Sequence, residues 1–168
     1  MRKLTIGIFI LLTVLLEQSC KENSSPSEGI GLVGAWKGKV QFKSGAFASV
    51  KDFEFMYVFN EGGTMTESSN YDGAPPVPPA YGIWRKTGDR EFESRYEFFF
   101  TRVPKSFDDI TASGGFSPAG YGILRETITL SQDGQSFRSI IKYDAFDLAG
   151  NQIESGSEAE TEAKRMSF

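Results

Sequence analysis

The sequence predicts an all-β protein, built as a single antiparallel eight-stranded up-and-down barrel. From residue 32 onward, apolar and polar residues alternate along most of the chain, and a helical period is nearly absent. Short segments containing Gly, Asn or Asp separate the alternating runs, as hairpin turns require, because these residues tolerate positive φ. Sequential hairpins hide every strand edge only when the sheet closes, so we favour a barrel over the alternative, a β-sandwich.

The alternation indicates which side chains face the core. In residues 51–59, Phe53, Phe55, Tyr57 and Phe59 fall on one face of an extended chain. This is the pattern of a sheet with one face in water. The expected strands cover residues 33–43, 50–60, 63–70, 80–87, 90–103, 119–131, 135–147 and 151–166, with at most a turn or two of helix near 105–110.

The last expected strand carries the densest charge pattern. Its acidic residues share one face, which we expect to lie in solvent. Small side chains share the other face and leave space opposite the aromatic rings of the other strands. The acidic face contains Glu154, Glu158, Glu160 and Glu162, and the small residues are Ser155, Ser157, Ala159 and Thr161.

The N-terminal twenty residues have the pattern of an export signal. Two basic residues, Arg2 and Lys3, precede an apolar run over residues 4–16. This run is too short for a bilayer span, which needs about 20 residues, and it fits the apolar region of a secretory signal. The run is followed by Ser19 and Cys20, the only cysteine of the chain, which therefore has no partner for an intrachain disulfide.

These features resemble a bacterial lipoprotein signal of the Bacteroidetes type. The resemblance implies a signal peptide over residues 1–19 and attachment of acyl chains such as palmitate to Cys20. The polar residues 20–31 would form a flexible tether, and residues 32–168 would form the barrel domain. The expected location is the bacterial cell envelope, with the lipid anchor in the outer membrane; the resemblance leaves the leaflet open.

Composition excludes several functions. The net charge of −4, which becomes −5 without residues 1–19, provides no electrostatic basis for nucleic-acid binding. The chain has no His, which excludes Ser-His-Asp and Cys-His catalysis and His-based metal sites. Four carboxylates are interpreted as solvated residues, and no cofactor is expected. These carboxylates are Asp108, Asp109, Asp144 and Asp147.

The domain resembles a lipocalin or calycin-type barrel. The residues that carry the resemblance are Gly34-Ala35-Trp36 at the start of the first strand and Arg165 near the end of the last. In that superfamily, a Gly-x-Trp motif places an indole at the closed end of the barrel, and a basic residue of the last strand crosses over it. The resemblance therefore implies that Gly34, Trp36 and Arg165 close the floor of the barrel, through a cation–π contact.

Aromatic side chains on the expected inner faces are candidates for contact with a ligand. Phe116, between glycines in the long loop 104–121, is a candidate lid, and Arg125 is a candidate inward-facing anion partner. Tyr71 and Tyr81 flank the proline-rich stretch 74–79 and are expected to frame the barrel mouth. The residues expected to contact the ligand are Phe55, Tyr57, Tyr96, Phe98, Tyr143 and Phe116.

Three functions fit this pattern. The first is binding or carriage of an apolar small molecule inside the barrel of a lipid-anchored protein. The second is a non-catalytic interaction or inhibitor-like module of the envelope, which would have a filled barrel and an exposed apolar patch near Tyr71 or Phe116. The third, less favoured, is a barrel isomerase or cyclase, which requires an Asp or Glu with a perturbed pKa inside the cavity.

Overall fold

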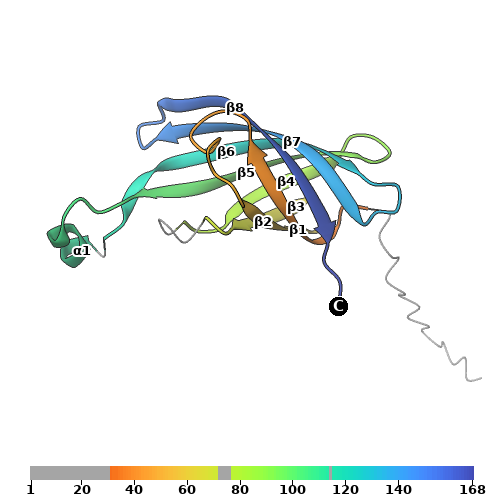
Figure 1. Ribbon diagram of the computed structural model, residues 1–168, viewed down its shortest axis with the longest axis horizontal. Helices are drawn as coiled ribbons and strands as arrows, with labels where there is room; N and C mark the ends of the chain where they lie inside the picture. The colour runs from red at the N-terminus through yellow and green to blue at the C-terminus, as the bar shows by residue number, and fades with distance from the viewer. Residues whose placement is uncertain (1–30, 72–76, 114) are drawn as a thin grey trace, which may run out of the picture.

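The structure is a closed barrel of eight antiparallel strands joined in sequence order (Figure 1). It is a computed structural model and describes residues 31–71, 77–113 and 115–168. The predicted up-and-down barrel is therefore confirmed, and the sandwich alternative is wrong. The strands are β1 (Gly34–Phe42), β2 (Glu54–Phe59), β3 (Thr64–Ser69), β4 (Ala80–Lys86), β5 (Glu91–Arg102), β6 (Ser117–Leu130), β7 (Ser136–Asp147) and β8 (Gln152–Arg165).

The barrel closes along the seam between β1 and β8. In this register Trp36 is opposite Arg165, and Phe42 is opposite Ala159. Gly38 allows the two strands to approach closely, since a Cβ at this position would lie 2.4 Å from the carbonyl oxygen of Glu162. Closure pairs the outer edges of β1 and β8 and leaves no free edge in the barrel.

One end of the barrel is filled and forms its floor. Trp36 is completely buried there, and its ring meets that of Phe137 edge-on with centroids 5.0 Å apart. The guanidinium of Arg165 lies over the indole, 4.2 Å from the ring centroid. Arg165 also donates hydrogen bonds to the carbonyl oxygens of Gly31 and Val33, before β1, and of Gly134 in the β6–β7 turn, so it links two other backbone segments across the floor. Gly34, with a φ of +131°, lies next to this guanidinium. A Cβ added to Gly34 would lie 2.7 Å from Nη1 of Arg165.

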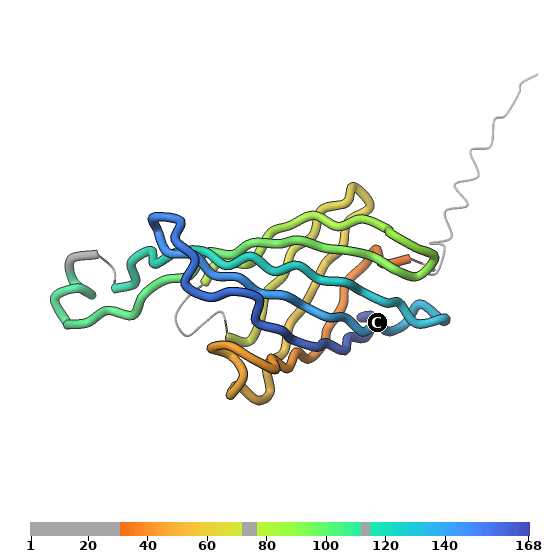
Figure 2. The backbone as a smooth tube through the Cα atoms, turned by 90° about the horizontal axis from the view of Figure 1, so that it is seen from above, coloured from red at the N-terminus to blue at the C-terminus, as the bar shows by residue number. Residues whose placement is uncertain are grey.

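The opposite end forms the mouth, and β5 and β6 extend beyond it. Figures 1 and 2 show this pair of strands projecting past the other strands and carrying α1 (Phe107–Ser113) at its tip. The expected helix at 105–110 is thus present, shifted toward the C-terminus. The expected long loop 104–121 is shorter than predicted, because β6 already begins at Ser117 and its pairing with β5 continues to Arg102.

The inward and outward faces follow the predicted alternation except near the start of β8. Glu154 faces the barrel interior, whereas the sequence pattern placed it outside; Ser155 is exposed instead of inward. The pairing of β7 and β8 shifts register here, and Gly156 has a φ of +63°. This irregularity reverses the alternation between Glu154 and Ser157, because one unpaired residue exchanges the two faces of a strand.

Candidate functional site

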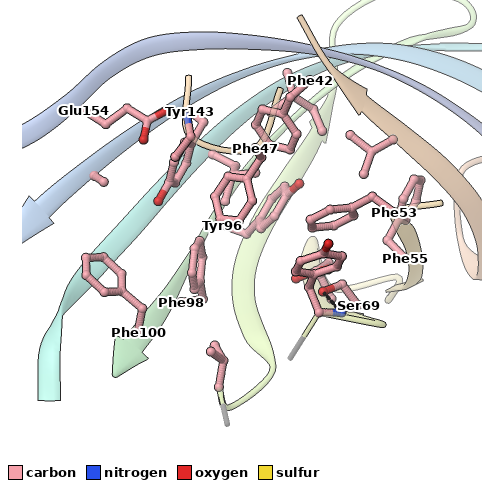
Figure 3. A pocket seen from close by; sticks show the side chains of 18 of the residues that line it. Phe42, Phe47, Phe53, Phe55, Ser69, Tyr96, Phe98, Phe100, Tyr143 and Glu154 are labelled. Carbon is pink, nitrogen blue, oxygen red and sulfur yellow. Dashed lines mark hydrogen bonds between the residues drawn. The ribbon is translucent and has the colours of Figure 1, made fainter. Parts of the chain in front are cut away.

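The mouth half of the barrel encloses a cavity of about 420 Å³. In Figure 3 the labelled rings from several strands turn toward this common space. Half of the described residues that line it are aromatic, so its wall is largely apolar. The aromatic residues are Phe42, Phe47, Phe53, Phe55, Tyr57, Tyr71, Tyr96, Phe98, Phe100 and Tyr143.

Five of the six side chains that sequence analysis proposed as ligand contacts line this cavity, namely Phe55, Tyr57, Tyr96, Phe98 and Tyr143. The sixth, Phe116, is not among the described lining residues. It lies directly before β6, and 39% of its surface is exposed to solvent. The extension of β5 and β6 carries Phe116 away from the opening, so this structure does not place it as a lid.

Residues of the mouth loops complete the cavity wall. Phe47, from the connection between β1 and β2, packs on Phe42 with ring centroids 5.3 Å apart and meets Tyr143 at 5.9 Å. Tyr71 stacks on Phe53 with centroids 4.9 Å apart and an interplanar angle of 4°. Tyr71 thus frames the mouth as expected, whereas the side chain of Tyr81 is exposed and is not among the described lining residues.

Two predictions for other residues have different outcomes. Arg125 faces outward and pairs with Asp144 on β7, with 2.5 Å between the nitrogen and oxygen atoms, so its assignment as an inward anion partner is wrong. The inward residue is its neighbour, Glu126. Most of the proline-rich stretch 74–79 lies outside the described residues, although Val77 lines the cavity.

Polar side chains form a layer between the floor and the cavity. The hydroxyl oxygens of Tyr57 and Tyr96 are 2.7 Å apart, and both rings line the cavity. Behind them, Glu126 is only 2% exposed. Its carboxyl group accepts hydrogen bonds from Ser94, Ser139 and Tyr57, and Ser139 in turn is hydrogen-bonded to the hydroxyl of Thr161. The buried residues of this polar layer are Tyr57, Ser94, Tyr96, Glu126, Ser139 and Thr161.

Burial dominates the electrostatics of this layer. It raises the pKa of Glu126 from its ordinary value of 4.5 to about 7, and the three hydrogen bonds oppose only part of this rise. Burial also raises the pKa values of Tyr57 and Tyr96 well above 10, with the negative charge of Glu126 adding to the effect. Glu126 is not itself among the described residues that line the cavity; Tyr57 connects the two.

Two further carboxylates do line the cavity. Glu67 on β3 is opposite Tyr57 in the β2–β3 register, and its charge contributes to the raised pKa values of both Tyr57 and Tyr96. Glu154 is nearer the mouth, where it accepts hydrogen bonds from the hydroxyl of Ser157 and the backbone amide of Ala46. The deep and outer parts of the cavity each therefore contain one acidic side chain.

The sequence pattern gave no prediction for Glu67 or Glu126, and it placed Glu154 on the solvent face. A signal for Glu126 is present in the sequence, since Leu124, Ile128 and Leu130 share its face of β6 and enclose it in an apolar series. Ser94 and Ser139 interrupt the apolar faces of β5 and β7 in the same way. A polar residue at an inward position of three neighbouring strands indicates a buried polar cluster, because isolated buried polar groups are costly.

The described residues contain no group of three or more His, Cys, Asp or Glu side chains arranged to hold a metal ion. No helix in the described part of the chain is long and apolar enough to cross a membrane. No protein-family model matches the chain, and no curated protein matches it either. The class of molecule is therefore defined by geometry: an eight-stranded up-and-down barrel with an internal cavity, which fits a calycin-like ligand-binding fold.

Proposed function

We propose that the barrel binds an apolar small molecule in the cavity between its mouth and its polar layer. The observation that carries this proposal is the size and character of the space, about 420 Å³ with aromatic side chains at half of the described lining positions. Ligand pockets typically measure about 300–1,000 Å³ and combine an apolar lining with a few polar groups. Here the hydroxyls of Tyr57 and Tyr96 supply polar groups at the inner end.

The binding energy would come from burial of the ligand against preformed walls. Phe42, Phe47 and Tyr143 pack on one another, which restricts their rotamers, so few side chains need to be ordered on binding. Removal of apolar surface from water contributes about 25 cal/mol per Å² before the costs of association. A carrier or scavenger of apolar molecules has this arrangement.

The experiment measures binding of the neutral fluorophore prodan, whose emission shifts to the blue in an apolar site. Ala145, which is buried and lines the cavity, is replaced by Phe to fill the space. The matched control is Ile140→Phe on the outer face of the same strand. We expect the wild type and the control to shift the emission, and Ala145→Phe to lose most of the effect while remaining folded by circular dichroism. Equal binding by all three proteins would show that prodan does not enter the barrel.

We also propose that the protein is anchored to the bacterial cell envelope through lipid on Cys20. The support is sequence alone, since Cys20 and the preceding signal lie outside the described residues. The apolar run, the following Ser19-Cys20 and the polar tether agree with lipidation and with a barrel held off the membrane. Cys20→Ala is expected to release the protein into the soluble fraction, and a mutant that still sediments with membranes would contradict the anchor.

A second function, docking of a protein partner, is favoured by one observation. Apolar side chains are exposed on the projecting end of β5 and on α1, at the opposite end of the barrel from the floor (Figure 2). They are Phe99, Val103, Phe107 and Ile110. The test is Phe107→Ser with Ile110→Ser: a docking surface predicts loss of a partner complex in native gels of host membranes, with prodan binding unchanged. If the complex persists, this surface does not form it.

A further inference from the structure

The charges around the cavity restrict what kind of apolar molecule fits. Of the described residues that line it, none is Lys or Arg, while Glu67 and Glu154 are both acidic. Ion pairs on the outer face of the described strands, such as Lys37 with Glu54 and Arg85 with Glu93, are exposed to solvent.

An anionic head group is disfavoured in such a space. A buried carboxylate needs an opposite charge or several hydrogen-bond donors to offset its loss of hydration. In this cavity it would instead meet the carboxylates of Glu67 and Glu154, and Coulomb repulsion would add to the cost. The cavity therefore selects against free fatty acids and other organic anions.

The same surroundings favour a cationic head group. The aromatic walls present ring faces, which attract ammonium groups through their quadrupoles, and aromatic enclosures are a known solution for binding such ions. Glu67 supplies the countercharge near the hydroxyls of Tyr57 and Tyr96, and these oxygens can accept hydrogen bonds from an N–H donor. The inner end of the cavity thus combines a negative charge, acceptor oxygens and aromatic rings.

We infer that the ligand class is an organic ammonium ion with an aromatic or alkyl body, its nitrogen placed at the inner end against Glu67, Tyr57 and Tyr96. This inference rests on the proposed binding function and specifies it. Glu67 is then a specificity-determining residue, and the rings of Phe98 and Tyr143 hold the apolar body of the ligand.

The test compares three compounds with the same naphthyl body: 2-(1-naphthyl)ethylamine, 2-(1-naphthyl)ethanol and 1-naphthylacetate. Isothermal titration calorimetry at pH 7 measures each affinity for the purified protein. We expect the amine to bind at least about tenfold more tightly than the alcohol, because charge-assisted hydrogen bonds exceed neutral ones by that order. The carboxylate is expected to bind most weakly.

Two variants assign the effect to the inner carboxylate. Glu67→Gln is expected to weaken amine binding by about tenfold and to leave alcohol binding unchanged. The matched control, Glu158→Gln, removes the same charge from an exposed position of β8 and should change neither affinity. Amine binding that is unaffected by Glu67→Gln would overturn the role of Glu67. If Glu67→Gln does not fold, the three compounds on the wild-type protein still decide the ligand class.

The outcomes separate this inference from the proposed function. Equal affinities, or tightest binding of the carboxylate, would overturn the ammonium assignment and leave the apolar-binding function standing. Binding of prodan but of none of the three naphthyl compounds would do the same. Absence of binding by prodan and by all three compounds would overturn the proposed function and the inference together.

Discussion

Glu126 lies directly opposite Ser94 in the β5–β6 register, and the hydroxyl of Ser94 donates a hydrogen bond of 3.3 Å to its carboxyl group. Two more hydroxyls, those of Ser139 and Tyr57, also donate to Glu126. Three donors partly compensate a carboxylate that is almost completely removed from water. The three hydrogen bonds do not fully offset the cost of burying the charge of Glu126, so the stability of the protein depends on pH.

We expect stability to fall between about pH 4.5 and pH 7. The unfolded chain releases the Glu126 proton near its ordinary pKa of 4.5, whereas the folded protein holds it up to about 7. Folding therefore takes up a proton in this pH range, and the free energy of unfolding decreases as the pH rises. The full loss is about 3 kcal/mol, reached above pH 7. Urea unfolding at pH 5 and pH 8, followed by tryptophan fluorescence, measures it.

Replacement of Glu126 isolates its contribution. Glu126→Gln resembles the protonated side chain, so its urea midpoint should exceed that of the wild type slightly at pH 5 and much more at pH 8. Asp133, Asp144 and Asp147 do not mimic this trend, because hydrogen bonds lower their pKa values and their contribution is lost only as the pH falls through those values. A wild type equally stable at pH 5 and pH 8 would contradict the burial of an ionisable Glu126.

The barrel was predictable from sequence because each strand carries its own alternation. Phe55, Tyr57 and Phe59 on β2, for example, can share one face only in an extended chain with one buried side. The predicted hairpin turns pair each strand with the next, so only the pairing of the first strand with the last is needed to close the barrel. The five aromatic residues correctly placed on the cavity wall follow from the same period-two pattern.

The predictions for Glu154 and Phe116 were wrong because their positions depend on backbone irregularity and on strand pairing, which the local alternation does not specify. The irregularity at Gly156 moved Glu154 from the outer to the inner face. A glycine in a strand is compatible with a bulge, but it does not fix where the register shifts. Phe116 was misplaced because the length of the β5–β6 extension depends on pairing with Arg102, which is distant in sequence. Whether inward rings fill or line a space depends on side-chain packing across the whole barrel, which alternation along one strand does not encode.

Trp36→Ala is expected to destabilise the protein by about 3–5 kcal/mol, the usual cost of deleting a large aromatic side chain from a packed core. Trp36 is fully buried, and its indole N–H donates a 2.8 Å hydrogen bond to the carbonyl oxygen of Leu32. The control is Phe99→Ala on the exposed face of β5, which should cost far less. Urea unfolding monitored by circular dichroism gives both values. A loss below about 1 kcal/mol for Trp36→Ala would show that the floor is not packed.

Arg165→Ala tests whether the floor depends on its guanidinium. The variant removes a cation–π contact and hydrogen bonds of 3.0, 2.7 and 2.6 Å to three carbonyl oxygens. We expect a loss of about 1–3 kcal/mol, since hydrogen bonds to charged groups are individually worth about that much. Arg138→Ala is the comparison, because Arg138 forms an exposed pair with Glu162 that is worth at most about 1 kcal/mol. Equal losses in the two variants would mean that Arg165 is no more than a surface cation.

Gly38→Ala tests the closure of the barrel itself. A methyl group on Gly38 would lie 2.4 Å from the carbonyl oxygen of Glu162 and 2.7 Å from the ring of Phe55, so β1 and β8 would have to move apart. Overpacking of this kind costs about 1–3 kcal/mol. The control is Gly62→Ala in the β2–β3 turn, where nothing lies within 4 Å of the added carbon.

The two glycine variants separate a closed barrel from an open sheet. If β1 and β8 pair as described, Gly38→Ala lowers the urea midpoint clearly more than Gly62→Ala. Amide exchange also becomes faster at Lys43 and Met166, whose N–H groups donate across the seam to the carbonyl oxygens of Glu158 and Ala35. In an open sheet, position 38 would have β2 on one side and solvent on the other. The added methyl group would then meet no backbone oxygen from β8, and exchange at Lys43 and Met166 would stay unchanged.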